Sequence, residues 1–130
     1  MSDSERSGSG DIDPGGQLAA GRCVPCQAGA PAVTAEELAR YRSQIPDWTV
    51  LVDGGSRRLR RIFTFKDFAE ALDFTNRVAE LAEREGHHPR LVLEWGRVTV
   101  DWWTHKIQDL HMNDLIMAAK TDALYGNGPA

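Results

Sequence analysis

All four histidines of this 130-residue chain lie between residues 83 and 114, a stretch that also carries most of the tryptophans. His87 and His88 are adjacent and precede Pro89, and His105 follows farther along the chain. Imidazole can gain or lose a proton near neutral pH, because its unperturbed pKa is about 6.5. Two or three histidines in one pocket could therefore act as acid and base in the same turnover, each step worth roughly 10²–10⁴-fold in rate.

Two other uses of these histidines are open. Three histidines can bind a catalytic zinc and leave a position for water. Adjacent side chains of an extended segment point in opposite directions, however, so His87 and His88 would not easily share one ion, and we predict no metal. A structural role is the other alternative, and it is the role that we predict for His111. We predict no cofactor, since the chain has no glycine-rich phosphate loop, nucleophile elbow or Ser/Cys triad context.

A helix must deliver the first two histidines. Residues 67–85 repeat apolar side chains at three- and four-residue spacing, which predicts an amphipathic helix, and Gly86 suits its end. Pro89 then favours an extended conformation for His88. The negative end of the helix would favour protonated His87 and His88, whereas burial would oppose it, and the sequence does not decide between them. The predicted core stripe of the helix is Phe68, Ala71, Leu72, Thr75, Val78, Ala79 and Ala82.

A hairpin must deliver the third histidine. Residues 91–94 and 97–103 read as strands joined at Trp95-Gly96, and the second ends just before His105. We therefore expect three imidazoles at one end of a sheet, beside a helix C-terminus. Strand alternation places Val98, Val100 and Trp102 on one face and Thr99, Asp101, Trp103 and His105 on the other. Trp102 is expected in the core, whereas Trp103 could cover a flat heterocyclic ligand.

The other elements complete an α+β domain. Thr34 and Glu37 form a capping box for a helix that runs to about residue 43, and residues 48–52 and 57–65 form a hairpin around a turn at 53–56. A last helix covers residues 113–124. The order α-β-β-α-β-β-α predicts a four-stranded antiparallel sheet with helices packed on one face. The side chains expected in the core are Leu38, Tyr41 and Ile45 from the first helix and Leu115, Ile116, Ala119 and Ala123 from the last.

The N-terminal part differs in composition from the rest. Residues 1–32 contain few large aliphatic side chains, so we predict a mostly disordered extension, followed by a domain at 33–125 and a frayed tail at 126–130. The extension contains a C-x-x-C motif, Cys23 to Cys26. The chain has no second cysteine pair to complete a zinc site and no thioredoxin-like context. An inert pair is favoured, and a redox switch or a metal shared between chains stays open.

Four arginines, at positions 57, 58, 60 and 61, surround Leu59 in the second predicted strand. They could form a phosphate-binding patch. A charged, solvated strand that resists edge-to-edge pairing is the alternative, and we favour it.

Composition sets further bounds. A chain of 130 residues and 14.4 kDa forms one domain, and a net charge of −4 offers no reason to expect nucleic acid or an anionic membrane as partner. No apolar run approaches the ~18 residues of a membrane-spanning helix, and no signal-peptide pattern is seen. Two cysteines make no secreted disulfide framework. We predict a soluble cytoplasmic protein.

The most specific motifs are His87-His88-Pro89 and Thr104-His105 at their observed spacing. Through these motifs, residues 33–124 resemble the pterin-4a-carbinolamine dehydratases in their bacterial form, which often carry a C-x-x-C ahead of the first helix. The other segments that carry the resemblance are Ile45-Pro46-Asp47-Trp48, Phe65-Lys66-Asp67-Phe68 and Phe74-Thr75-Asn76-Arg77-Val78, with Glu83, Val98, Leu110 and Asp114.

The resemblance implies a metal-free enzyme that dehydrates 4a-hydroxytetrahydropterin to quinonoid dihydropterin, in tetrahydrobiopterin recycling. It also implies a homodimer or homotetramer built by sheet pairing. Of the three matching active-site histidines, we predict that His88 and His105 are the acid/base pair and that His87 orients the pterin. The residues expected to bind substrate are Glu83, Pro89, Trp103, Thr104 and Asp114.

Two positions depart from the family pattern. Asp109 stands where the family usually has glycine, and Leu91 stands where many animal members have an aromatic residue. They keep a second class of function open, because some relatives act through protein clients. Animal members are dimerisation cofactors of a transcription factor, and a branch in carboxysome-bearing bacteria assists RuBisCO assembly. The arginines around Leu59 and the segment with Cys23 and Cys26 are candidate surfaces for such a client.

Overall fold

A computed structural model describes residues 16–25 and 27–126 of the chain. The predicted order of elements is confirmed, and two short 3-10 helices, η2 (Leu18–Ala20) and η3 (Arg42–Gln44), are added to it. The main elements are α1 (Ala35–Tyr41), β1 (Thr49–Asp53), β2 (Ser56–Thr64), α2 (Phe68–Glu85), β3 (Arg90–Glu94), β4 (Arg97–Trp102) and α3 (Met112–Gly126).

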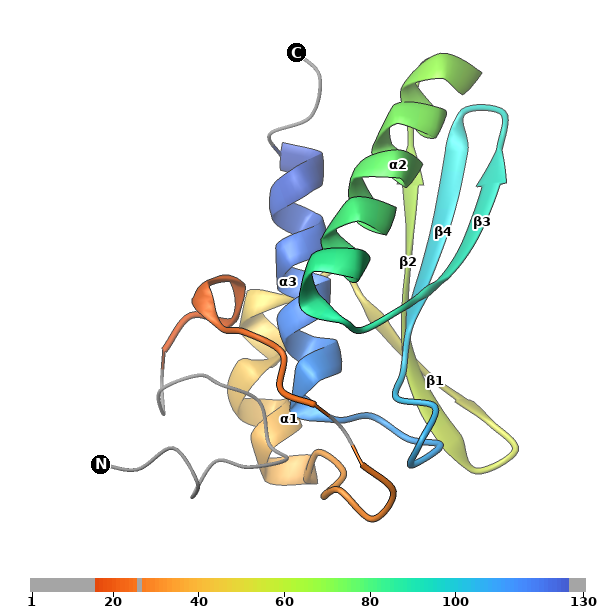
Figure 1. Ribbon diagram of the computed structural model, residues 1–130. Helices are drawn as coiled ribbons and strands as arrows, with labels where there is room; N and C mark the ends of the chain where they lie inside the picture. The colour runs from red at the N-terminus through yellow and green to blue at the C-terminus, as the bar shows by residue number, and fades with distance from the viewer. Residues whose placement is uncertain (1–15, 26, 127–130) are drawn as a thin grey trace.

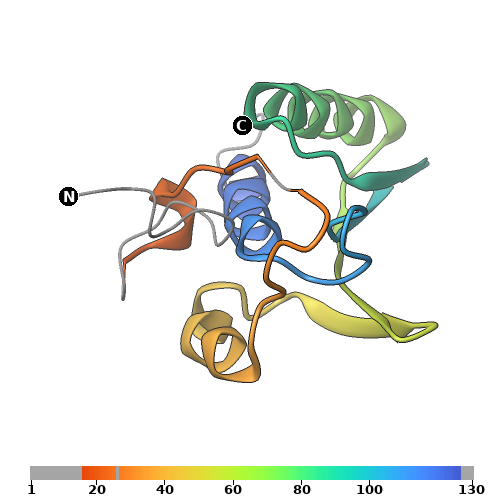
Figure 2. The ribbon, with the colours of Figure 1, turned by 60° about the horizontal axis from the view of Figure 1, so that its bottom comes forward.

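The four strands form one antiparallel sheet in the order β1-β2-β4-β3. The three α-helices cover one face of this sheet, as Figures 1 and 2 show from two directions, and no helix of the described residues lies over the other face. The α+β fold with helices on one face is thereby confirmed. Because β2 and β4 are the central strands, the end of β4 carries the chain from the middle of the sheet into the predicted site.

The helix ends that the sequence predicted from capping residues are present in the structure. The Thr34 hydroxyl accepts a hydrogen bond from the amide of Glu37 at 3.0 Å, and the Glu37 carboxylate accepts one from the amide of Thr34 at 2.9 Å, so the capping box is complete. Asp67 caps α2, and Gly86 ends it in the left-handed conformation at φ 66°. Glycine at that position avoids the strain that a side chain would bring there.

The core lies between the sheet and the helices. Val98, Val100 and Trp102 of β4 are fully buried, as the alternation predicted. The ring of Phe63 on β2 lies 4.7 Å from that of Phe74 on α2, which ties the longest helix to a central strand.

The face that α2 turns inward differs from the predicted stripe. Phe68 and Leu72 are 43% and 40% exposed, and Ala79 is also exposed. Phe74 and Leu81 are buried instead, beside the correctly predicted Ala71, Val78 and Ala82. The spacing rule weighs all apolar residues alike, whereas the packing places the Phe74 ring against those of Phe63 and Phe65 and so sets the rotation of the helix.

The prediction of a solvated strand around Leu59 is wrong. β2 pairs with β1 on one side and β4 on the other, so it is no edge strand. Its arginines form ion pairs with acids of neighbouring segments, because a partly buried charge needs a partner. The pairs are Arg57 with Asp109, Arg58 with Asp53 and Asp101, Arg60 with Asp101, and Arg61 with Asp47 and Asp122.

Two further expectations need correction. Ala123 of α3 is exposed, although Leu115, Ile116 and Ala119 are buried as predicted. Residues 16–25 were expected in a mostly disordered extension, yet Leu18 is fully buried and η2 packs on α3. Burial of a large apolar side chain stabilises an ordered segment, and the average composition of residues 1–32 conceals this single leucine. Residues 1–15, 26 and 127–130 lie outside the described part. Within that part, no helix combines the length and apolar character needed to cross a membrane.

Candidate active site

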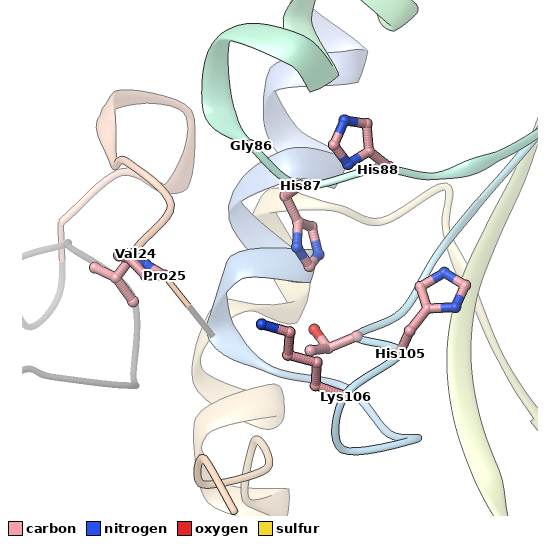
Figure 3. Close-up of a pocket in the computed structure, with 8 residues that line it drawn as sticks. Val24, Pro25, Gly86, His87, His88, His105 and Lys106 are labelled. Atoms are coloured by element: carbon pink, nitrogen blue, oxygen red, sulfur yellow. The ribbon is translucent and has the colours of Figure 1, made fainter. Parts of the chain in front are cut away.

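The end of α2 and the end of β4 meet at a pocket of about 340 Å³. Three histidines line it: His87 and His88 come from the segment after Gly86, and His105 comes from the loop after β4 (Figure 3). The expected gathering of three imidazoles is therefore present. The complete lining is Val24, Pro25, Gly86, His87, His88, Thr104, His105 and Lys106.

His87 is held in place from behind. Its Nε2 lies 2.6 Å from Oδ1 of Asp114, and its ring stacks on that of Trp102 with the centroids 5.7 Å apart. Asp114 is fully buried, and its other oxygen accepts hydrogen bonds from the Thr104 hydroxyl at 2.7 Å and from the amide of His111 at 2.9 Å. These contacts fix the orientation of the His87 imidazole.

The side chain of His88 differs from that of His87 in orientation, contacts and exposure. The rings of His87 and His88 point in different directions, as expected for adjacent residues leading into Pro89 (Figure 3). Nε2 of His88 lies 2.6 Å from Oε2 of Glu83, one turn back on α2. The side chains of His88 and Glu83 are 59% and 79% exposed, so this imidazole is open to solvent and to a ligand.

His105 is also exposed, on a loop with a defined backbone. The amide of Thr104 donates to the carbonyl of Asp109 at 3.0 Å, and the side-chain amide of Gln108 donates to the carbonyl of His105 at 2.7 Å. The His105 ring lies 4.5 Å from that of Trp103, over which the guanidinium of Arg58 lies at 4.0 Å. The aromatic and cationic groups beneath His105 therefore limit where its imidazole can lie.

Only some of the predicted substrate-binding residues lie in the pocket lining. Thr104 lines the pocket, whereas Glu83 and Trp103 lie behind His88 and His105. Pro89 is not part of the lining. Asp114 was expected to bind substrate, but its full burial means that it reaches the pocket only through His87 and Thr104.

Lining residues that the sequence analysis missed are Lys106, Val24 and Pro25. Lys106 directly follows His105, and this adjacency was the available signal. Val24 and Pro25 lie inside the C-x-x-C motif, far along the chain from every histidine, and no spacing rule connects them with the site.

Neither of the two residues that depart from the family pattern is part of the pocket lining. Asp109 points toward β2, where its carboxylate accepts hydrogen bonds from the Arg57 guanidinium at 2.7 and 3.1 Å. These bonds hold the pKa of Asp109 below its usual range, so the carboxylate is charged but paired. Leu91 is partly buried against the core and is not among the pocket residues.

The remaining candidate residues have structural surroundings. His111 is fully buried, its Nδ1 accepts a hydrogen bond from the amide of Asn113 at 3.0 Å, and burial lowers its pKa, which agrees with the predicted structural role. Burial also raises the pKa of the Cys23 thiol far above its usual range, so little of the reactive thiolate forms at neutral pH. Cys26 lies outside the described residues.

A shared metal ion has no evident place in the described part of the chain. Among residues 16–25 and 27–126, no three His, Cys, Asp or Glu side chains form a group that could hold one. Nε2 of His87 and Nε2 of His88 each face a different carboxylate, as described above. That catalysis is metal-free stays a prediction.

Comparisons with known proteins show which family the chain is similar to. Residues 31–124 match the family described as pterin 4 alpha carbinolamine dehydratase. A relative from Syntrophotalea carbinolica, whose name places it in this family, is 66% identical over 102 residues, which cover 78% of this chain and 91% of the relative. Another, from Chlorobaculum tepidum, is 57% identical over 108 residues, which cover 83% of this chain and 97% of the relative.

Two solved structures share the fold. A transcriptional coactivator/pterin dehydratase from Brucella melitensis is 30% identical with a TM-score of 0.66, over 74% of this chain and all of that one. A pterin dehydratase-like protein identified as a RuBisCO assembly factor in the alpha-carboxysome is 26% identical with a TM-score of 0.53, over 62% of this chain and 90% of that one. The resemblance inferred from the motifs is thus confirmed, and the chain belongs to the pterin 4 alpha carbinolamine dehydratase family.

Proposed function

We propose that this protein dehydrates pterin-4a-carbinolamine to quinonoid dihydropterin by histidine acid/base catalysis, as a step in tetrahydrobiopterin recycling. The observation that carries the proposal is the pocket lined by His87, His88 and His105, in which one imidazole is fixed and two are exposed. Family membership supplies the substrate class, and the lining supplies groups able to exchange protons near neutral pH.

The chemistry needs one acid and one base. The acid protonates the departing hydroxyl as the C–O bond breaks and water leaves. The base removes the proton from a ring N–H, and the freed electron pair forms the C=N bond of the product. His88 and His105 are suited to these steps because their rings are open to a ligand, whereas His87, held by Asp114, orients the pterin.

The proposal is tested by following the decay of the 4a-carbinolamine with purified protein. Wild type should accelerate this decay above its spontaneous rate, with a pH dependence in the histidine range. His105→Ala should lose about 10²–10⁴-fold in kcat, the range for one proton-transfer group, while circular dichroism stays unchanged.

A matched control is Trp95→Ala, which removes an exposed ring at the other end of the β3–β4 hairpin and should keep full activity. Wild-type protein that leaves the spontaneous rate unchanged would exclude the proposed reaction. Activity of His105→Ala equal to wild type would exclude the assigned role.

A second candidate function is assembly of a protein client, favoured by the fold shared with the RuBisCO assembly factor. The two are separated by rescuing a knockout with the His88→Ala, His105→Ala double variant. Failure to rescue supports catalysis as the physiological role. Rescue equal to wild type would mean that the role depends on an outer surface and not on the pocket.

A further inference from the structure

One wall of the pocket comes from a segment outside the four-stranded domain. Val24 and Pro25 line the pocket, and Figure 3 shows them on the other side of His87 from His105. They belong to residues 16–25, which we call the strap. Figure 2 shows the strap running alongside α3. The proposed chemistry needs only the histidines, so the strap requires an explanation of its own.

The far end of the strap is anchored to the helices. Leu18 is fully buried, and its amide donates to Oε1 of Gln44 at 2.7 Å. The ammonium of Lys120 on α3 donates to the carbonyl of Ala19 at 3.0 Å. These contacts hold residues 18–20 on the domain without involving the pocket.

The pocket end is held by two side chains, those of Asn113 and Glu85. The Asn113 amide group contacts both backbone polar groups of Val24: its Oδ1 accepts from the Val24 amide at 3.0 Å, and its Nδ2 donates to the Val24 carbonyl at 2.8 Å. Asn113 is 1% exposed, so the pair of bonds is shielded from water. The amide of Cys23 also donates to Glu85 of α2 at 3.0 Å.

The same helical turn holds His87. Asn113 directly precedes Asp114, which holds His87, and both residues lie in the first turn of α3. The position of the strap is therefore set by the element that sets the position of His87. A ligand between them would contact one rigid unit.

We propose that Val24 and Pro25 form a substrate-binding wall that packs against the flat bicyclic heterocycle, and that Asn113 is the positioning residue for this wall. The inference rests on the proposed function for its ligand class. Val24 and Pro25 offer apolar contact, which suits the face of a ring system, while the exposed imidazoles supply the polar contacts. Residues 16–25 thus complete the site.

The contact is tested with Val24→Ala, which withdraws two methyl groups from the pocket. The dissociation constant for 7,8-dihydrobiopterin, measured by titration calorimetry, should rise about five- to tenfold, as expected for lost apolar contact of this size. Val52→Ala makes the same substitution at an exposed site on β1 and should leave the constant unchanged. A wild type without affinity for dihydrobiopterin overturns the proposed function and this inference with it. If wild type binds dihydrobiopterin but its dissociation constant equals that of Val24→Ala, this inference alone is overturned.

The positioning role is tested with Asn113→Ala. Because His87 keeps Asp114, the KM for the carbinolamine should rise about tenfold while kcat stays within about threefold, the pattern of a lost binding contact. An Asn113→Ala variant with a lowered kcat and unchanged KM would overturn the assignment. Circular dichroism verifies folding, and if the variant does not fold, the Val24→Ala titration decides.

A readout independent of catalysis is the reactivity of Cys23, which lies in the strap. In a Cys26→Ser background one cysteine remains, so labelling by a thiol reagent reports on Cys23 alone. Asn113→Ala should label at least tenfold faster than the background chain, and Asn76→Ala, an exposed asparagine of α2, should label at the background rate. Saturating dihydrobiopterin should slow labelling of the background chain severalfold. Equal rates in all variants, with and without ligand, would overturn the strap as part of the site.

Discussion

Two aspartates of this protein, Asp101 and Asp114, are both fully buried, yet they have opposite surroundings. Asp101 lies on β4 and accepts two hydrogen bonds from Arg60 at 2.7 and 2.8 Å, with Arg90 at 3.4 Å and Arg58 at 3.7 Å. Asp114 lies at the start of α3 and meets one imidazole, one hydroxyl and one backbone amide.

The two aspartates differ in whether their partners carry a permanent charge. Guanidinium keeps its charge at every physiological pH, so the arginines around Asp101 form ion pairs between strands that do not depend on pH in this range. The groups around Asp114 are an imidazole, a hydroxyl and a backbone amide, and they hold the His87 ring in the pocket lining. We infer that Asp101 serves the sheet and Asp114 serves the site, and the following variants test that division.

The largest effect is expected for Asp114→Asn. The amide cannot supply the negative charge that orients the His87 imidazole, so kcat should fall by up to about 10⁴-fold, the loss seen when the acid behind a triad histidine is neutralised. Steady-state kinetics of the carbinolamine measure it, with circular dichroism as the control for folding. A kcat within threefold of wild type would contradict the role assigned to Asp114.

Asp101→Asn should instead lower the stability of the fold and leave the activity nearly unchanged. Loss of the buried charge leaves Arg58, Arg60 and Arg90 without their common partner, and the free energy of unfolding should fall by about 2–3 kcal/mol. This is below the full cost of breaking a buried pair, since Arg60 and Arg90 are partly exposed and can be hydrated. Urea denaturation measures it. At temperatures well below thermal unfolding, the activity of the variant should stay within about fivefold of wild type. A larger loss of activity would show that Asp101 also serves the site.

Asp109 offers an intermediate case, because its pair with Arg57 is about a quarter exposed on each side. Asp109→Ala should lower the free energy of unfolding by about 1–2 kcal/mol at neutral pH. Arg57 lowers the folded-state pKa of Asp109, so this contribution is present above about pH 4 and is lost as the pH falls through the folded value. Stability curves of variant and wild type should therefore run parallel from pH 5 to 8 and converge in acid. A gap that persists at pH 2 would show that the pair is not its source.

The smallest effect concerns His111, whose amide donates to Asp114. Burial lowers the pKa of His111, so the unfolded chain binds a proton more readily, and wild-type stability should fall as the pH drops below about 6.5. His111→Asn keeps an acceptor at the start of α3 and removes the titration, so its stability should change less between pH 7.5 and 5.5. Thermal melts at the two pH values measure it, and equal slopes in both proteins would exclude His111 as the titrating group.

Features that depend on neighbouring residues were predictable from the sequence. The capping box at Thr34, the helix end at Gly86 and the hairpin at Trp95-Gly96 each involve residues within a few positions of one another. The gathering of the three histidines was also predictable, since it follows from the ends of a helix and a strand in a fold with known connections. Local conformational preferences decide such features before packing begins.

Contacts between distant segments were decided only by the tertiary structure. Asp114 behind His87, Asp101 against Arg60, and the strap against Asn113 join residues that are 27 to 89 positions apart. The rotation of α2 belongs here too, because it follows from the fit of Phe74 against β2. Such contacts are selected by the free energy of packing the whole chain, to which many pairings contribute at once, so no single spacing in the sequence encodes them.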